Sequence, residues 1–365
     1  MKLKDITSAI EELAPPAYQE DYDNAGLLTG SPDMEVTGAL FCVDVTDEVL
    51  DEALETGANL VVSHHPLVFR PLKKLTGATR VERLLLKAVR NGLALYAAHT
   101  NLDSVEGGVS FAMADRLGLR NVRVLSPREN DLVKIAVYTP EAYADKVREA
   151  LAQAGAGHIG KYDACSFNVC GEGTFRAGDG ARPFVGEPGV LHREREVRTE
   201  TIVPRHRLRA AVEAMRRVHP YEEAAYDLYP LANPNPSVGF GAVGDLEREE
   251  PLADFLQRVK KVFGAEAVRY SQPDRETVRK VALCGGSGGS LLEEAVRSGA
   301  DVYLTADVKY DLFYAARGRI VLADIGHFES EYFAIDILYD TVTKKFPNFA
   351  ACKSTKSINP INYLV

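Results

Sequence analysis

The sequence predicts an α/β protein in which two similar α/β halves form one domain, interrupted by an inserted α+β segment. Three observations support this. Short apolar runs alternate with helical patterns, the pattern returns near the C-terminus, and a segment of different character separates the two copies. Strands that alternate with helices are typical of a mainly parallel sheet. We place the first half at residues 1–126, the insert at 127–235 and the second half at 236–365.

The first half shows the alternation most clearly. Apolar runs predict buried strands at residues 39–45, 59–64 and 93–98, and helical patterns follow them at residues 46–56, 80–91 and 108–117. Thr46 is a suitable N-cap for the first of these helices, and Gly57 ends it. Acidic side chains in its first turn are favoured by the helix dipole.

An internal repeat predicts that the second half has the same organisation. Moving the chain by 242 positions aligns residues 40–65 with residues 282–307, and both windows show a strand, a helix, Gly-Ala and a second strand. Six residues of the first window meet identical residues in the second, namely Cys42, Leu50, Glu52, Ala53, Gly57 and Ala58. A further strand is predicted at residues 319–323.

The insert lies between Ser126-Pro127 and the proline-rich Asn233-Pro-Asn-Pro236. Strands are predicted at residues 132–138, 200–203 and 224–229, helices at 141–154 and 205–217, and several short strands in a glycine-rich stretch between them. Two successive β-α-β units are typical of a ferredoxin-like module.

Composition narrows the function classes. The net charge of −9 argues against a general nucleic-acid or anionic-membrane binder, because both partners attract cationic proteins. The five cysteines form no Cys-x-x-Cys pair, which argues against a thiolate metal cluster or a disulfide framework. The N-terminus has no signal-peptide pattern and no apolar run is long enough to span a membrane, so we expect a cytoplasmic protein.

The adjacent histidines His64 and His65 end the predicted strand at residues 59–64. Imidazoles are preferred ligands of borderline metals such as zinc. Neighbouring residues that leave a strand point to opposite sides, so each histidine is better placed to hold one of two ions than to share one. The second copy of the repeat has Ala306 and Asp307 at these positions.

Two further motifs follow predicted strands. Asp103, in His99-Thr-Asn-Leu-Asp103, is a hard anionic ligand, and His99 is a ligand or a proton shuttle. His327 and Glu331 are four residues apart and share one face of a helix that begins there. Active sites of parallel sheets form beyond the carboxyl ends of the strands, so we expect the three motifs to meet.

Each motif also has a structural explanation, because a single histidine or carboxylate is more often structural or solvated. The glycine-rich run 285–290 could cradle a phosphate, but it lacks the Lys-Ser/Thr of a P-loop, and a structural turn with a capping box at Ser290 and Glu293 is favoured. For His219-Pro-Tyr-Glu-Glu223 we favour a turn or a subunit contact.

The motifs resemble those of the Nif-three-like family, whose members are also named GTP cyclohydrolase I type-two homologues. The matching segments run in family order over almost the whole chain: Asp23-Asn-Ala-Gly-Leu27, Ser63-His-His-Pro66, His99-Thr-Asn-Leu-Asp103 and His327-Phe-Glu-Ser-Glu331. The central segment is similar to the PII- and CutA-like insert of longer bacterial members, on the segments Gly171-Glu-Gly-Thr-Phe175 and His219-Pro-Tyr-Glu-Glu-Ala224.

The resemblance implies two divalent metal ions per chain, zinc, iron, manganese or cobalt, with Glu331 bridging them. The implied ligands are His64, His65, Asp103, His327 and Glu331, and each of these positions carries the residue type that the family uses. The resemblance also implies a ring-shaped homohexamer.

Two functional hypotheses follow. The first is a metal-dependent hydrolase that attacks a nucleotide or purine-like substrate with a metal-bound hydroxide, with His99 and Glu331 as catalytic residues and with Thr100 and Asn101 orienting the ligands. The second is a non-catalytic metal-binding or regulatory hexamer whose PII-like insert senses a small molecule or binds a partner. We expect no nucleic-acid or membrane partner.

Overall fold

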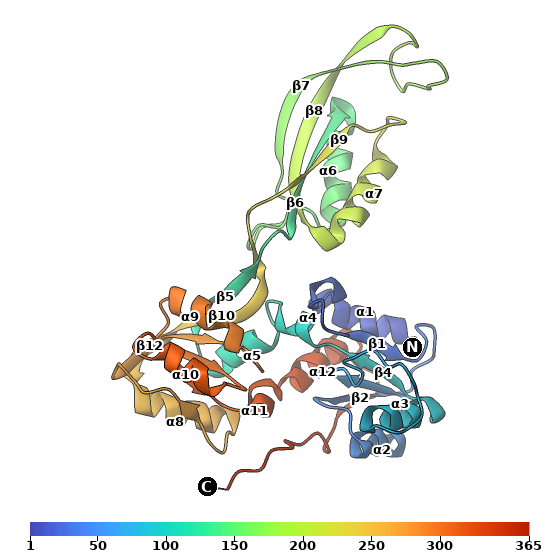
Figure 1. The fold of residues 1–365 in the computed structure, drawn as a ribbon. Coiled ribbons are helices and arrows are strands. Elements are labelled where there is room, and N and C mark those ends of the chain that lie inside the picture. Colours follow the sequence, from blue (N-terminus) through green and yellow to red (C-terminus); the bar gives the residue numbers. More distant parts are fainter. Residues whose placement is uncertain (365) are drawn as a thin grey trace. The chain divides into compact units, whose positions relative to one another are not determined.

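The computed structural model describes residues 1–364 of this mixed α/β protein (Figure 1). The chain forms two compact units. The first comprises Met1–Ser126 together with the chain from Ser237 onward, and the second comprises Pro127–Pro236. No helix among residues 1–364 is both long and apolar enough to cross a membrane.

The first unit contains two sheets, and the N-terminal sheet has the order β1-β4-β3-β2-β15. Its parallel centre is formed by β2 (Ala39–Cys42), β3 (Leu60–Ser63) and β4 (Ala94–Ala97). At the edges, β1 (Gly26–Thr29) runs antiparallel to β4, and β15 (Ala351–Lys353) runs parallel to β2. These three central strands are the ones that the apolar runs predict.

Both faces of this sheet are buried, because alternate residues of each strand point to opposite sides. Leu40 and Val61 pack with α2 (Asp47–Thr56) and α3 (Arg80–Arg90), whereas Phe41 and Val62 share a core with α1 (Leu3–Leu13) and α12 (Ala334–Lys345). The predicted ends of α2 are confirmed. The Thr46 hydroxyl accepts a hydrogen bond from the Val49 amide, and Gly57 is left-handed with φ 74°.

The C-terminal sheet has the order β11-β14-β13-β12-β10-β5 and repeats the arrangement. Its parallel strands are β12 (Thr277–Leu283), β13 (Val302–Thr305) and β14 (Val321–Asp324), and β11 (Arg269–Tyr270) runs antiparallel to β14. The long β10 (Asn235–Pro251) is antiparallel to β12. One face packs with α9 (Leu292–Arg297) and α10 (Tyr310–Ala316), and the other with α5 (Val109–Arg116) and α8 (Leu252–Phe263).

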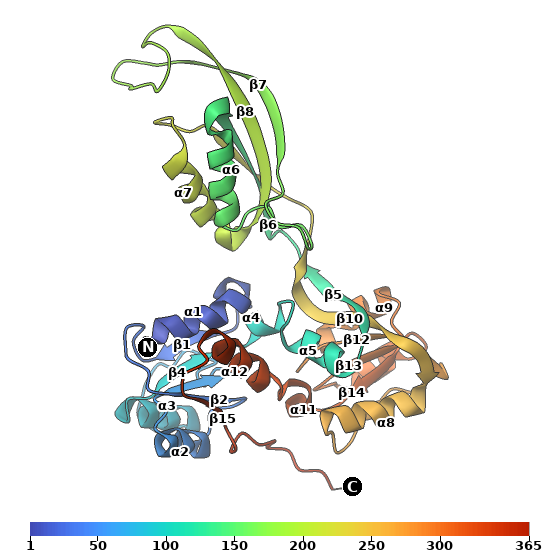
Figure 2. The same cartoon turned by 180° about the vertical axis from the view of Figure 1, so that it is seen from behind.

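The two halves of the sequence exchange segments across the first unit (Figure 2). From the first half, β5 (Arg120–Arg128) joins the C-terminal sheet, whereas α12 and β15 from the second half complete the N-terminal layer. One apolar cluster contains residues of both sheets and of the helices between them. The exchange and the shared core hold the strand ends of both halves in fixed positions.

The second unit is a four-stranded antiparallel sheet of order β7-β8-β6-β9. Along the chain it runs β6 (Leu132–Pro140), α6 (Ala144–Gln153), β7 (Phe167–Arg176), β8 (Leu191–Pro204), α7 (Leu208–Val218) and β9 (Tyr226–Pro230). The apolar pattern predicts only the buried end of β8, because the start of β8 and most of β7 are exposed.

Candidate metal centre

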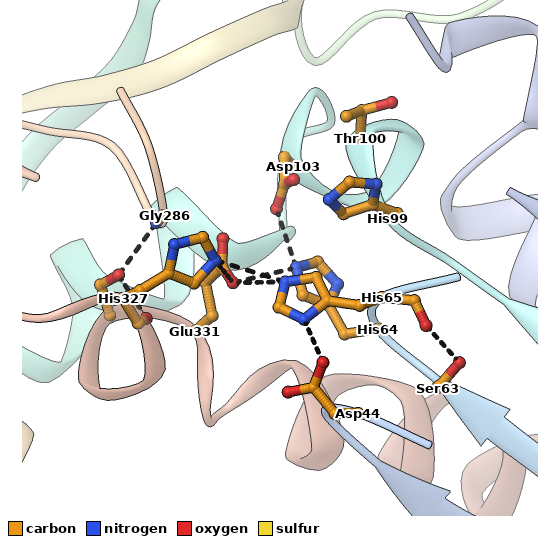
Figure 3. Close-up of polar contacts among 12 residues, drawn as sticks. Asp44, Ser63, His64, His65, His99, Thr100, Asp103, Gly286, His327 and Glu331 are labelled. Atoms are coloured by element: carbon orange, nitrogen blue, oxygen red, sulfur yellow. Dashed lines mark hydrogen bonds and ion pairs between the residues drawn. The ribbon is translucent and has the colours of Figure 1, made fainter. Parts of the chain in front are cut away.

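Three strand ends of the first unit carry the predicted ligands to one place (Figure 3). His64 and His65 follow β3, and His99 follows β4 and precedes the short helix α4 (Thr100–Asp103). The helix α11 (His327–Glu331) follows β14, so His327 and Glu331 lie one turn apart as the spacing predicts.

Glu331 lies at the centre of the cluster. Its Oε2 is 2.9 Å from His65 Nε2 and 2.9 Å from His327 Nε2, and the two imidazole nitrogens are 3.4 Å apart. Ligand atoms that lie about 2.1 Å from one ion are separated from each other by about 3.0–3.4 Å. The separation of the two imidazole nitrogens falls in this range, and the two 2.9 Å separations, which are also hydrogen-bond distances, lie just below it, so these three atoms could hold one metal ion.

A second group lies on the other side of Glu331. His64 Nε2 is 3.6 Å from Asp103 Oδ1 and 3.7 Å from Glu331 Oε2, distances too long for hydrogen bonds. Both His64 Nε2 and Asp103 Oδ1 are buried and have no hydrogen-bond partner among residues 1–364. Buried polar atoms are almost always paired, and a cation between these two would satisfy both. This observation shows that the residues present fit a metal ion.

The far nitrogen of each imidazole is already occupied. His64 Nδ1 lies 2.8 Å from the carbonyl oxygen of Ala98, and His65 Nδ1 lies 3.0 Å from Asp44 Oδ1. Similarly, His327 Nδ1 lies 2.6 Å from Asp307 Oδ2. When Nδ1 donates to these acceptors, each ring is fixed with the lone pair of Nε2 facing the cluster, which is the arrangement of metal-binding histidines.

His99 is held by a separate network. Its Nδ1 lies 2.8 Å from Asp23 Oδ1, and the Thr100 amide donates to Asp23 Oδ2 at 3.1 Å. Asn101 Oδ1 accepts from the His99 amide at 2.9 Å. Burial acts to raise the pKa of Asp23, but the hydrogen bonds from His99 and Thr100 outweigh it and hold the pKa at about 2. Asp23 is therefore ionised at neutral pH and lies within hydrogen-bond distance of His99.

The electrostatics of the cluster favour added positive charge. Burial lowers the pKa of His65, but its hydrogen bonds to Asp44 and Glu331 outweigh burial and raise it to about 10. The pKa of His327 rises in the same way to about 9, against burial, through Glu331 and Asp307. Burial raises the pKa of Asp103 to about 6. Without a metal ion the carboxylates favour the protonated form of the imidazoles. A divalent cation would supply the positive charge that these protons otherwise provide.

The glycine-rich run makes room for Glu331. A Cβ on Gly286 would lie 2.0 Å from Glu331 Oε1, and the residue is left-handed with φ 59°. The amides of Gly286 and Gly288 donate to the hydroxyls of Ser330 and Thr305. These contacts favour the structural turn over the phosphate cradle.

The capping box predicted at Ser290 is wrong. Residues 289–291 form a 3-10 turn, and α9 begins after Leu291 without a side-chain cap. Glu293 instead pairs with Arg319. The turn makes Ser290 part of the helical segment, which removes it from the capping position.

The motif around His219 belongs to the second unit, where it is used in packing. His219 Nε2 lies 3.0 Å from the carbonyl oxygen of Tyr138, and the Tyr221 hydroxyl donates to Glu196 at 2.8 Å.

The sequence did not reveal that three carboxylates orient the imidazoles, namely those of Asp23, Asp44 and Asp307. It also missed that His99-x3-Asp103 and His327-x3-Glu331 are equivalent in the repeat, each following the third parallel strand of its sheet. The connection between β13 and β14 is shorter than that between β3 and β4, so the shift that aligns the earlier strands does not align these motifs. A second comparison of the chain with itself at a different shift would reveal them.

The fold and the site define an α/β protein with His, Asp and Glu groups that could hold a divalent metal. The model of the family Duf34/NIF3 (NGG1p interacting factor 3) matches residues 1–360, and the chain belongs to this family.

Relatives named "GTP cyclohydrolase 1 type 2 homolog" include two bacterial proteins that match most of the chain. The chain is 42% identical to the Halalkalibacterium halodurans protein over 88% of this chain and 87% of the relative, and 38% identical to the Bacillus subtilis protein over 98% of each. The crystal structure of a Bacillus cereus protein related to NIF3 matches with TM-score 0.85 at 36% identity, covering 100% of this chain and 99% of that one.

Proposed function

We propose that the cluster is a dinuclear centre and that the protein is a metal-dependent hydrolase of a nucleotide or purine-like substrate. One observation carries the proposal: Glu331 belongs to two possible ligand groups, one with His65 and His327 and one with His64 and Asp103. A carboxylate shared by two such groups is placed to bridge two ions. The histidine and carboxylate donors suit zinc, iron, manganese or cobalt.

Two ions in this position would lower the pKa of a coordinated water and polarise an electrophilic carbon or phosphorus. The chain's own residues supply orientation and a proton site. Asp44 and Asp307 hold His65 and His327 by their Nδ1 atoms. Asp23 holds His99 in the same way, which leaves His99 Nε2 to accept or deliver a proton.

The name of the relatives supports a purine nucleotide as the first substrate to test. Protein loaded with zinc, manganese or iron and given GTP should release formate if one water opens the purine ring and a second hydrolyses the resulting formamide. His65→Ala should abolish this release, whereas His158→Ala, which removes an exposed histidine of the insert, should leave it unchanged. No turnover with any of these metals, or equal turnover in His65→Ala, would contradict the proposal.

The competing proposal is a regulatory protein whose insert responds to a small molecule. The insert has its own apolar core, and the strand order β7-β8-β6-β9 with two β-α-β units supports a ferredoxin-like, PII-like module. It also contains a cavity of about 340 Å³ whose lining includes Arg148, Cys165 and Thr199. Deleting residues 127–236 should leave metal binding intact under both proposals. It would preserve turnover in an enzyme and abolish a ligand response in a sensor.

The predicted homohexamer is part of the same proposal. Sedimentation equilibrium of the full chain measures its mass directly, and a monomer would contradict it.

A further inference from the structure

Two exposed aromatic rings continue the histidine cluster outward. The ring of Phe69 lies 6.1 Å from that of His99, and the ring of Tyr22 lies 6.2 Å from that of Phe69. His99 itself lies 5.3 Å from His65. Tyr22 is 64% exposed and Phe69 is 42% exposed, although large aromatic side chains are usually buried. A row of rings therefore leads from the candidate ligands to the surface.

The two loops that carry these rings are tied together. The side-chain amide of Asn24 donates to the carbonyl oxygen of Val68 at 2.6 Å, and these residues are close neighbours of Tyr22 and Phe69 in sequence. Asp23, between Tyr22 and Asn24, is anchored to His99 and Thr100. The wall formed by Tyr22 and Phe69 is therefore preorganised, which lowers the entropic cost of binding a ligand against it.

The loop after Phe69 is cationic although the chain is acidic. Arg70, Lys73 and Lys74 are exposed, and within residues 1–364 none of them forms an ion pair. Cations that follow an exposed aromatic residue closely in the same segment are suited to a ligand that combines a planar ring with phosphate, since rings stack on aromatic side chains and cations attract phosphate.

We propose that Tyr22 and Phe69 form the stacking wall for the base of a nucleotide, and that Arg70, Lys73 and Lys74 receive its phosphate. This inference rests on the proposed function, because it places the substrate's ring next to the candidate metal ligands. It adds the recognition element that the ligand residues alone do not provide.

The sequence has no tryptophan, so Phe69→Trp introduces a single fluorescent reporter that keeps an aromatic ring at this position. Metal-loaded Phe69→Trp would be titrated with GMP, guanosine and ribose 5-phosphate. We expect quenching by GMP at the lowest concentration, quenching by guanosine at higher concentration, and none by ribose 5-phosphate, which has no base to stack.

Calorimetry on the protein without the added tryptophan separates the stacking wall from the proposed phosphate site. Phe69→Ala and Tyr22→Ala should each weaken GMP binding about tenfold or more. The double variant Lys73→Ala/Lys74→Ala should weaken GMP binding and leave guanosine binding unchanged. Tyr162→Ala, which removes a 75% exposed ring of the insert, is the matched control and should bind GMP like the wild type.

Three results would overturn the inference: no GMP binding by the metal-loaded wild type, unchanged affinity in both aromatic variants, or a changed assembly mass in Phe69→Ala with unchanged GMP affinity. The last would identify the wall as a contact between copies of this chain. Because binding is measured without turnover, Phe69-dependent GMP binding in a protein that never hydrolyses GTP would refute the proposed hydrolase alone. Turnover with unaffected aromatic variants would refute only the stacking wall.

Discussion

The two halves of the first unit have the same strand order but carry different side chains at equivalent positions. After the second parallel strand, the first half has His65 and the second has Asp307. These residues have complementary roles, since His65 faces Glu331 whereas Asp307 holds the far nitrogen of His327. A repeated backbone can thus supply a candidate ligand from one copy and the group that orients a candidate ligand from the other.

The residue that follows the first parallel strand also differs between the two halves. Asp44 holds His65 in the first half, and its equivalent Gly286 has no side chain and leaves space for Glu331 in the second. Only the third strand ends alike, with His99 and Asp103 in one half and His327 and Glu331 in the other. The central carboxylate, Glu331, therefore comes from the second half, where glycine replaces the aspartate found after the first parallel strand of the first half.

The strongest test of this asymmetry compares the two equivalent carboxylates. Glu331 belongs to two of the three possible ligand groups among the described residues, whereas Asp103 belongs to one. We expect two ions per chain in the wild type, none in Glu331→Ala and one in Asp103→Ala, measured by elemental analysis of protein purified and loaded identically. Equal metal loss in the two variants would show that the halves contribute alike.

A methyl group at Gly286 should also empty the site. Its Cβ would meet Glu331 Oε1 at 2.0 Å, so we expect Gly286→Ala to displace the carboxylate and lose most of the metal. Gly299→Ala is the control, because Gly299 is likewise left-handed, with φ 73°, but has nothing within 4 Å. Both substitutions should cost about 1–2 kcal/mol of stability through their positive φ. Melting curves measure the backbone strain, and metal content measures the displacement of Glu331. Equal metal content in Gly286→Ala and Gly299→Ala would contradict this role of Gly286.

Metal affinity should rise steeply with pH, because binding releases one proton from an imidazole of each half. The metal-free protein holds the pKa of His65 at about 10 and that of His327 at about 9, so both imidazoles are protonated near neutral pH. An ion that binds both must displace two protons, and its affinity should rise about a hundredfold per pH unit below these pKa values. Calorimetry in two buffers of different ionisation enthalpy counts the released protons, and a pH-independent affinity would contradict the coupling.

The supporting carboxylates should have a smaller effect. Asp44→Asn and Asp307→Asn each keep the shape of the side chain but remove the charge that fixes an imidazole. Both carboxylates are about half exposed, so we expect a loss of about tenfold in metal affinity, the lower end for such supporting groups. Competition with a chelator measures it. A loss in only one variant would show that the two halves do not support their histidines equally.

Much of the first unit could be predicted because its strands are short apolar runs bounded by helix signals. Thr46 and Gly57 mark both ends of α2, and the structure places them as cap and terminator. The ligand motifs could be predicted because histidines and carboxylates at the ends of parallel strands converge. Local patterns could not predict the exchange of β5 and β15, which depends on which sheet edge is free.

The orienting groups were beyond local patterns for a related reason. Asp23 contacts His99 across a long stretch of chain, and although the motif Asp23-Asn-Ala-Gly-Leu27 marks this segment, no local pattern names His99 as its partner. The exposed strands of the insert were not predicted for a different reason. β7 buries too little of its surface to show an alternation of apolar residues. Long-range polar contacts and exposed strands are features that periodicity does not encode.

The smallest expected effect concerns the equivalent helices α2 and α9. The Thr46 hydroxyl accepts a hydrogen bond from the Val49 amide, whereas α9 starts from a 3-10 turn and has no side-chain cap. Thr46→Ala should therefore lower the free energy of unfolding by about 1 kcal/mol, and Ser290→Ala by much less, since the Ser290 hydroxyl does not cap its helix. Urea denaturation of the two variants measures the difference. Equal losses would mean that the second half caps its helix as the first does, and that the repeat is more symmetrical at its helix starts than at its ligands.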